Sequence, residues 1–357
     1  MPYQWDPVCT PPRLVRPVRI DPSGEHGPTK SQAAGPRWRR TTPGLHVPSA
    51  TDSERPEQRI LEQSMRLPPG TGVTGWAGLR LFGAAFFDGL APDGRTRLAV
   101  PLALGSRGRI RPHGQVELLY EHLPTADLTV RQGISTTTLL RSTFDAVRKA
   151  RDDREAVVTI DMACAAGLIS PERLRRAVSD RPGWRGIDRA RRALELCSEH
   201  SRSPNETRLR LVWRLDARLP PPLVNCPIRS IESGRLLGIA DLFDEEAGLV
   251  VEYDGADHRS ARRHTADVDR EDRLRRHDLE VVRVTGMALR DTAALVDRLL
   301  AARLRARHLP EHLRTWVAVP AADDLETRLR RREGRRREIP GDPLRSDDDQ
   351  GVLSGRT

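Results

Sequence analysis

Residues 236–258 read LLGIADLFDEEAGLVVEYDGADH, and this stretch decides the fold of the C-terminal half of the chain. It contains two apolar runs, 236–243 and 249–253, whose length and composition are typical of β-strands. The polar residues 244–248 between them end in a glycine, which predicts a turn. We therefore expect two strands that follow one another directly.

Each strand carries acidic residues at positions that the apolar pattern predicts to be sheltered. Asp241 is in phase with Ile239, and Glu252 shares a face with Asp254, because side chains alternate between the two faces of a strand. Carboxylates inside an apolar sheet repel one another unless a proton or a cation offsets their charge. Asp241, Glu252 and Asp254 are therefore candidate ligands of a hard ion such as Mg²⁺, with Mn²⁺ as an alternative.

The flanking residues predict the rest of an α/β (α+β) domain. Ser203 is a candidate helix N-cap, followed by Pro204 at the first helical position and by Glu206 at the position that completes a capping box. The helix is expected to end before Pro220. The other expected elements are strand 226–231, then the two strands above, then helix 266–277 and strand 280–284. The order is α-β-β-β-α-β.

These residues resemble a known family of nucleases. Glu206 on a helix, Asp241 on a strand, and Glu252-Tyr253-Asp254-Gly255 followed by His258 are similar to the core of the PD-(D/E)xK superfamily. The branch that they resemble most is the very-short-patch-repair endonucleases. The resemblance covers about residues 201–305 and implies a restriction-endonuclease-like core with Mg²⁺-dependent activity on DNA.

The resemblance also implies a role for each residue. Asp241, Glu252 and Asp254 would hold one or two metal ions. Glu206 would complete the site from its helix, and His258 would activate water or protonate the leaving oxygen. Each residue also has a structural interpretation: Glu206 as a helix cap, Asp241 as the start of a solvated turn, Glu252 and Asp254 as charges on an edge strand, and His258 as an ordinary loop residue.

The lysine in the superfamily's name is missing. The position two residues after Glu252 holds an aspartate, and the two lysines of the chain, Lys30 and Lys149, lie far from the nuclease-like segment. His258 is the candidate that could replace the lysine as a base or ligand. An arginine could supply only the electrostatic part of the role, and the candidates are Arg270 and Arg283. Both are also candidate contacts to the DNA backbone.

Residues 20–200 resemble a different family, the abortive-infection type IV antitoxins. The resemblance rests on VTGWAGLRLFGA at 73–84 and on Thr137 followed by RSTFD at 141–145. It implies a mixed, mainly helical region that regulates or binds DNA. Within it, a short helix followed by a basic hairpin predicts a winged-helix-like unit, whose candidate DNA-binding residues are Arg37, Arg39 and Arg40.

Composition favours a nucleic-acid partner. The 357 residues carry a formal net charge of +10, and all but two of the 60 basic residues are arginine, which suits contacts to phosphate. No apolar run is long enough for a membrane span or a signal peptide, so a cytoplasmic, nucleoid-associated protein is expected. We also expect residues 1–19 to be flexible and the charged residues 318–357 to be disordered.

Two functions from different classes remain at this point. The first is a metal-dependent DNA endonuclease of the repair or defence type. The second is a noncatalytic DNA-binding regulator of the antitoxin type, which the missing lysine keeps open. A homo-oligomer and a toxin or repair partner are both left open. Metal-dependent cleavage that requires Asp241 and Glu252 would discriminate the two functions.

Overall fold

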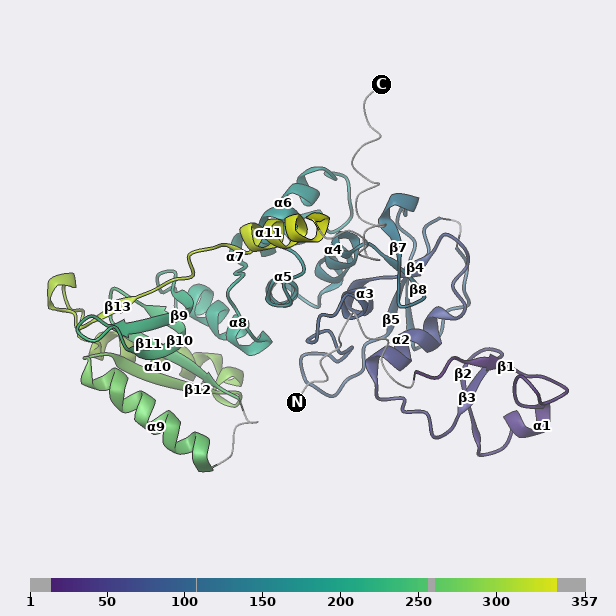
Figure 1. Ribbon diagram of the computed structural model, residues 1–357, viewed down its shortest axis with the longest axis horizontal. Helices are drawn as coiled ribbons and strands as arrows, with labels where there is room; N and C mark the ends of the chain where they lie inside the picture. The colour runs from purple at the N-terminus through teal and green to yellow at the C-terminus, as the bar shows by residue number, and fades with distance from the viewer. Residues whose placement is uncertain (1–13, 107, 256–260, 339–357) are drawn as a thin grey trace, which may run out of the picture. The chain divides into compact units, whose positions relative to one another are not determined.

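The structure is a computed structural model, and it describes residues 14–106, 108–255 and 261–338 (Figure 1). The chain divides into two compact units. The N-terminal unit comprises the residues up to 150 together with 176–190 and those from 330 onward, and the C-terminal unit comprises 151–175 and 191–329. The mixture of helices and sheets confirms the α/β (α+β) class.

The C-terminal unit is built on a five-stranded sheet with the strand order β12-β11-β10-β9-β13. Its strands pair in antiparallel fashion except for β11 and β12, which are parallel. The strands are β9 (Leu223–Ser230), β10 (Leu236–Asp244), β11 (Leu249–Asp254), β12 (Glu280–Thr285) and β13 (Trp316–Ala318). The turn 245–248 joins β10 to β11, as the sequence predicts.

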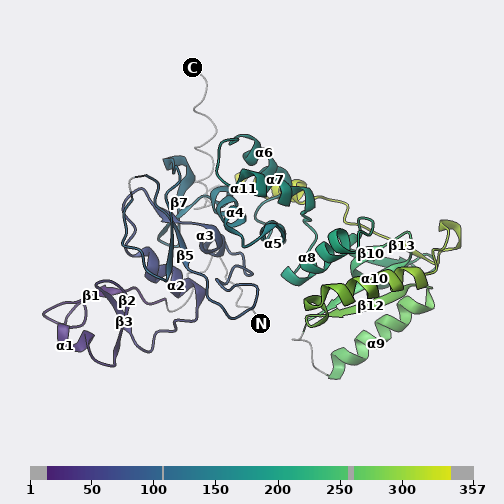
Figure 2. The ribbon, with the colours of Figure 1, turned by 180° about the vertical axis from the view of Figure 1, so that it is seen from behind.

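Helices cover both faces of this sheet. On one face, Trp213, Leu242 and Val251 share a buried cluster with residues of α10, which lies in front of the sheet in Figure 2. On the other face, Phe243 and Val250 pack in a second cluster with Leu274 of α9. The helices are α8 (Pro204–Leu211), which continues as a π-helical turn (Val212–Asp216), α9 (Ala261–Arg276) and α10 (Thr292–Arg305). The observed order α8-β9-β10-β11-α9-β12 agrees with the expected α-β-β-β-α-β.

The C-terminal unit begins earlier in the chain than residue 200, where the sequence analysis placed its boundary. Helix α5 (Asp153–Ala165) packs on α8 through a buried polar cluster. Arg210 Nη2 and Thr207 Oγ1 donate to Asp161 Oδ2 over 2.7 and 2.8 Å, and the Asp161 side chain is fully buried. Because an unpaired buried charge is costly, this ion pair ties α5 to the sheet domain.

The N-terminal unit contains two sheets. One has three antiparallel strands in the order β1-β3-β2, and the other has five strands in the order β6-β5-β4-β8-β7. The strands are β1 (Val18–Arg19), β2 (Trp38–Thr42), β3 (Leu45–Pro48), β4 (Gly72–Val73), β5 (Val100–Ala103), β6 (Val116–Leu119), β7 (Leu128–Arg131) and β8 (Ile134–Thr137). The helices that lie wholly in this unit are α1 (Lys30–Ala33), α2 (Pro56–Ser64), α3 (Gly75–Leu81) and α4 (Leu139–Lys149). Helices α6 (Pro171–Ser179) and α7 (Ile187–Leu196) belong partly to the residue ranges of this unit and partly to those of the C-terminal unit.

Among the described residues of 20–200, more lie in helices than in strands, which agrees with a mixed, mainly helical region. Strand β4 has two residues and carries too little periodicity to be read from sequence. One expectation for this region is wrong. The winged-helix prediction fails for residues 14–50. Their one helix, α1, has four residues, which is too short to act as a recognition helix.

The segments that resemble the antitoxins form a buried polar network. Thr74 Oγ1 donates to Asp145 Oδ2 over 2.7 Å, and Thr137 Oγ1 donates to Thr74 Oγ1 over 2.8 Å. Arg141 and Arg148 bind the same Asp145 carboxylate from one side of α4. All five side chains are buried, so these residues join α3, β8 and α4 rather than face a ligand.

Parts of both chain ends are ordered, contrary to expectation. Residues Val18–Arg19 form β1, and the backbone of Val15 exchanges two hydrogen bonds with Gln58. Residues Leu325–Glu338 form helix α11, because Leu325 and Leu329 find buried positions despite the surrounding arginines. The rest of the predicted tail, 339–357, and residues 1–13 lie outside the described residues. None of the helices that the structure describes has both the length and the apolarity needed to cross a bilayer.

Candidate functional site

Strands β10 and β11 separate at the point where the predicted acidic residues lie. The two strands pair from Leu242 opposite Val251 to Asp244 opposite Leu249. Beyond that point, β10 continues along β9 while β11 continues along β12. Asp241 and Glu252 are therefore the first residues past the last β10–β11 pair, one on each strand.

Asp241 lies at this fork, and one of its carboxylate oxygens links β10 to β11. Its Oδ2 accepts a hydrogen bond from the backbone N–H of Tyr253 over 2.7 Å. The side chain therefore provides a partner for a backbone N–H at the point where β10 and β11 no longer pair. Burial, together with the negative charges of Glu206 and Glu252, raises the pKa of Asp241 to about 7. The Tyr253 N–H and the positive charge of Arg270 act in the opposite direction. Glu206 and Glu252 thus lie close enough to Asp241 to disfavour its ionised form.

Glu206 acts both as part of the helix cap and as part of this cluster. Ser203 Oγ accepts the N–H of Glu206 over 3.2 Å, which confirms Ser203 as the N-cap of α8. The Glu206 carboxylate accepts the N–H of Arg202 over 2.8 Å, one residue earlier than an ordinary capping box predicts. Glu206 also raises the pKa of Asp241, so its structural and its functional interpretation are compatible.

Glu252 is buried, and an arginine of α9 neutralises part of its charge. Arg270 Nη2 donates to Glu252 Oε2 over 2.9 Å. Arg283 Nε is 3.9 Å from the same oxygen and closer, at 3.0 Å, to Glu271 Oε2. Both arginines, expected as DNA contacts, therefore also serve as ion-pair partners within the domain.

Asp254, the third predicted carboxylate, is exposed at the end of β11. His258 lies outside the described residues. Within the described ranges, no three His, Cys, Asp or Glu side chains are arranged to hold a metal ion together.

A two-carboxylate site is still compatible with Mg²⁺. This ion commonly keeps several waters and uses one or two protein carboxylates together with substrate phosphate. Asp241 and Glu252 supply such a pair, and a cation placed there would offset the charge that raises the pKa of Asp241. The donor chemistry of the site therefore fits the expected ion.

Asn225 on β9 is a site residue that sequence reasoning missed. Its Nδ2 donates to Glu206 Oε2 over 2.7 Å and to the carbonyl oxygen of His200 over 2.9 Å. Its backbone is in the left-handed region, with φ of 47°, which asparagine tolerates better than most residues. An asparagine inside the apolar run before Cys226 is the signal that could have identified it.

The basic hairpin of the N-terminal unit is partly engaged in its own fold. Arg39 binds Glu62 with both terminal nitrogens, over 3.0 and 2.7 Å, and this hydrogen bonding raises the pKa of Arg39. Arg40 Nε donates to the carbonyl oxygen of Thr42 over 3.4 Å. Arg37 and Arg40 are exposed, so these two arginines remain as candidate phosphate contacts.

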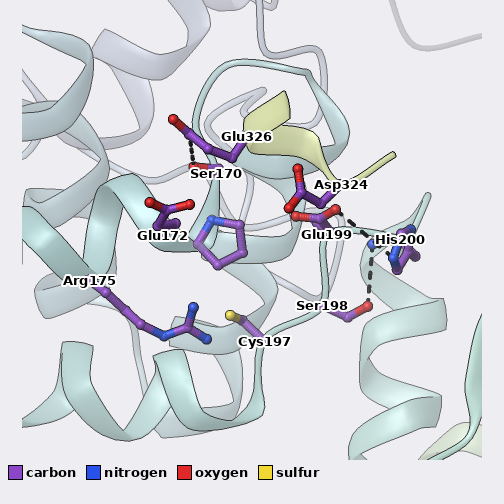
Figure 3. A pocket seen from close by; sticks show the side chains of 10 residues that line it. Ser170, Glu172, Arg175, Cys197, Ser198, Glu199, His200, Asp324 and Glu326 are labelled. Carbon is purple, nitrogen blue, oxygen red and sulfur yellow. Dashed lines mark hydrogen bonds and ion pairs between the residues drawn. The ribbon is translucent and has the colours of Figure 1, made fainter. Parts of the chain in front are cut away.

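A separate polar pocket of about 460 Å³ lies elsewhere in the C-terminal unit (Figure 3). Sequence reasoning did not single it out. Burial raises the pKa of Cys197 at its wall to about 12, so the thiol is not prepared to act as a nucleophile. Glu199 accepts the N–H of Leu325 over 2.7 Å, and Ser170 donates to Glu326 over 2.6 Å. Its acidic side chains thus hold α11 in place.

The chain was compared with models of protein families, with curated proteins and with solved structures, and nothing matches in any of the three comparisons. The interpretation of the site therefore rests on its geometry and on the residues themselves.

Proposed function

We propose that this protein is a metal-dependent endonuclease that hydrolyses phosphodiester bonds in DNA. The observation that carries the proposal is the fork between β10 and β11. Asp241 and Glu252 come together there with Glu206, and the pKa of Asp241 is raised to about 7. Carboxylates gathered in a strand fork suit a divalent cation, which would also accept a phosphate oxygen of the substrate as a ligand.

The mechanism assigns separate tasks to the residues of the chain. Asp241 and Glu252 would hold Mg²⁺, which when bound lowers the pKa of a water molecule and stabilises charge on the phosphate. Arg270 lies against Glu252 and would provide a fixed positive charge for the scissile phosphate. A guanidinium offers only N–H donors and no acceptor, so Arg270 cannot take a proton from water. His258 remains the predicted proton acceptor.

DNA as the substrate is supported by charge. The net charge of +10, carried almost entirely by arginine, favours binding to a polyanion. Base-specific readout would require side chains in a groove, and the proposal therefore extends to the DNA backbone only.

The second candidate is a noncatalytic DNA-binding regulator. One observation favours it: Arg270 already neutralises Glu252 over 2.9 Å in a chain that has no lysine near the site. A carboxylate that is paired within the protein can serve the fold without any metal.

The test is cleavage of supercoiled and of mismatch-containing duplex DNA with Mg²⁺, Mn²⁺ or EDTA. We expect metal-dependent cutting that is lost in Asp241→Asn and in Glu252→Gln. Glu245→Gln is the matched control, because it removes one exposed negative charge at the far end of the same hairpin. If the two site variants cut as well as the wild type, the nuclease proposal fails. Absence of cutting alongside retained DNA binding favours the regulator.

A further inference from the structure

Helix α11 presents a row of arginines on one face. Arg328, Arg332 and Arg335 follow the spacing i, i+4, i+7, which places them along one side of a helix. All three side chains are exposed. A segment that the composition assigns to disorder is therefore a charged, ordered surface.

The start of α11 is held firmly by the C-terminal unit. Leu325 and Leu329 are buried, with exposed fractions of 4% and 7%. The Glu326 carboxylate accepts a hydrogen bond from Ser170 Oγ over 2.6 Å (Figure 3). It also accepts one from Arg173 Nε over 2.8 Å. Arg332 continues the i, i+4, i+7 stripe of Leu325 and Leu329, and Arg328 and Arg335 lie beside that stripe. The arginines are therefore exposed next to the buried face of the helix.

Some of the charges on this helix repel one another. Arg328 and Arg332 are like charges one turn apart, and such pairs destabilise a helix. An anionic partner would remove that repulsion. A membrane surface fits poorly, because the apolar residues Leu325 and Leu329 face the protein and are not available to enter a bilayer.

The geometry matches the backbone of duplex DNA. At 1.5 Å per residue, Arg328 and Arg335 lie about 10 Å apart along the helix axis. Phosphates of one DNA strand repeat every 3.4 Å or so along the duplex axis, so the row spans about three of them. We propose that α11 binds duplex DNA through its phosphates, with Arg328, Arg332 and Arg335 as the contacts. The proposal takes its partner from the proposed function but does not require catalysis.

The test measures the salt dependence of binding to a short DNA duplex in EDTA, where metal-dependent cutting cannot occur. The slope of log K against log salt reflects the number of phosphates neutralised, at about 0.9 per phosphate. The triple variant R328Q/R332Q/R335Q should reduce the magnitude of the slope by about 2 to 3, whereas R328K/R332K/R335K should preserve it. The matched control R95Q/R109Q/R111Q removes three exposed charges from loops of the N-terminal unit and should change the slope by less than about one.

Two outcomes would overturn the proposal. One is an equal loss of slope in the α11 variant and in the loop control, because the loss would then follow from the lower net charge of both variants. The other is an unchanged slope in the α11 variant, with its far-UV circular dichroism and melting temperature like those of the wild type. Equally tight, arginine-dependent binding to phosphatidylserine vesicles would point to a membrane instead and would also count against it. Because binding is measured without metal, failure of the nuclease proposal leaves this test unaffected.

Discussion

Asp241 combines burial with neighbouring negative charge, and its titration therefore couples to stability. Its pKa rises from 3.8 to about 7 on folding, so the folded protein binds a proton that the unfolded chain releases between these values. The stabilising effect of the bound proton is complete below pH 3.8 and is lost as the pH rises through 7. By linkage, the loss approaches about 4 kcal/mol as an upper bound.

We therefore expect the melting temperature to fall between pH 5 and pH 8, and the fall to be smaller in Asp241→Asn. Mg²⁺ should raise the melting temperature more at pH 8 than at pH 5, because the deprotonated carboxylate is the ligand. Thermal unfolding across this range checks both effects. A pH dependence that is identical in wild type and variant would show that Asp241 does not titrate as described.

Asn225 is a positioning residue for Glu206, and its backbone and side-chain roles can be separated. Asn225→Ala loses the hydrogen bonds to Glu206 and to the His200 carbonyl and also strains a residue with φ of 47°, at a combined cost of about 1 to 3 kcal/mol. Asn225→Gly removes the same two hydrogen bonds without the strain, because glycine tolerates positive φ. We expect both variants to lower cleavage while glycine keeps more stability. Denaturant unfolding and cleavage rates measure the two effects, and full cleavage in Asn225→Gly would exclude the positioning role.

Among elements, the contact of α5 with α8 is predicted to be sensitive to a single substitution. Asp161→Ala would leave the Arg210 guanidinium buried without its carboxylate, which costs about 3 to 5 kcal/mol. Asp153→Ala on the same helix removes an exposed partner of Arg192 and should cost less than about 1 kcal/mol. Urea unfolding of both variants compares them directly. Similar midpoints would mean that the ion pair contributes little to joining the two helices.

Helix α11 illustrates why element prediction from composition fails at such segments. Residues 325–338 contain many arginines and few apolar side chains, which is typical of disorder. Two leucines four residues apart are enough to order this helix, because both become buried in the folded protein. Ser170 and Arg173, which are distant in the sequence, also bind Glu326.

At the scale of the whole molecule, DNA binding and cleavage should be separable. The proposed site and the α11 row use different residues, so Asp241→Asn should abolish cutting while its affinity for duplex DNA stays within about threefold of the wild type. The Asp241→Asn substitution removes a negative charge, so it can only weaken the repulsion between the site and the phosphates of DNA. Fluorescence anisotropy in EDTA, beside the cleavage assay, measures both properties. A large loss of affinity in this variant would mean that the acidic cluster maintains the fold that binds DNA.

The sequence by itself determined the order of elements around 236–258 and the presence of acidic residues in the central strands. Both follow from local periodicity, which needs no knowledge of distant residues. It also identified Ser203 as a helix cap, because capping depends on the residues of one turn.

Tertiary structure decided which of these groups meet. The separation of β10 from β11 brings Asp241 and Glu252 to one fork, and the packing of α9 places Arg270 beside Glu252. Asn225 joined the site, and Asp254 is exposed, because strand twist and backbone conformation set the direction of each side chain. The burial that raises the pKa of Asp241 depends on the whole surrounding fold, so no local pattern could have predicted it.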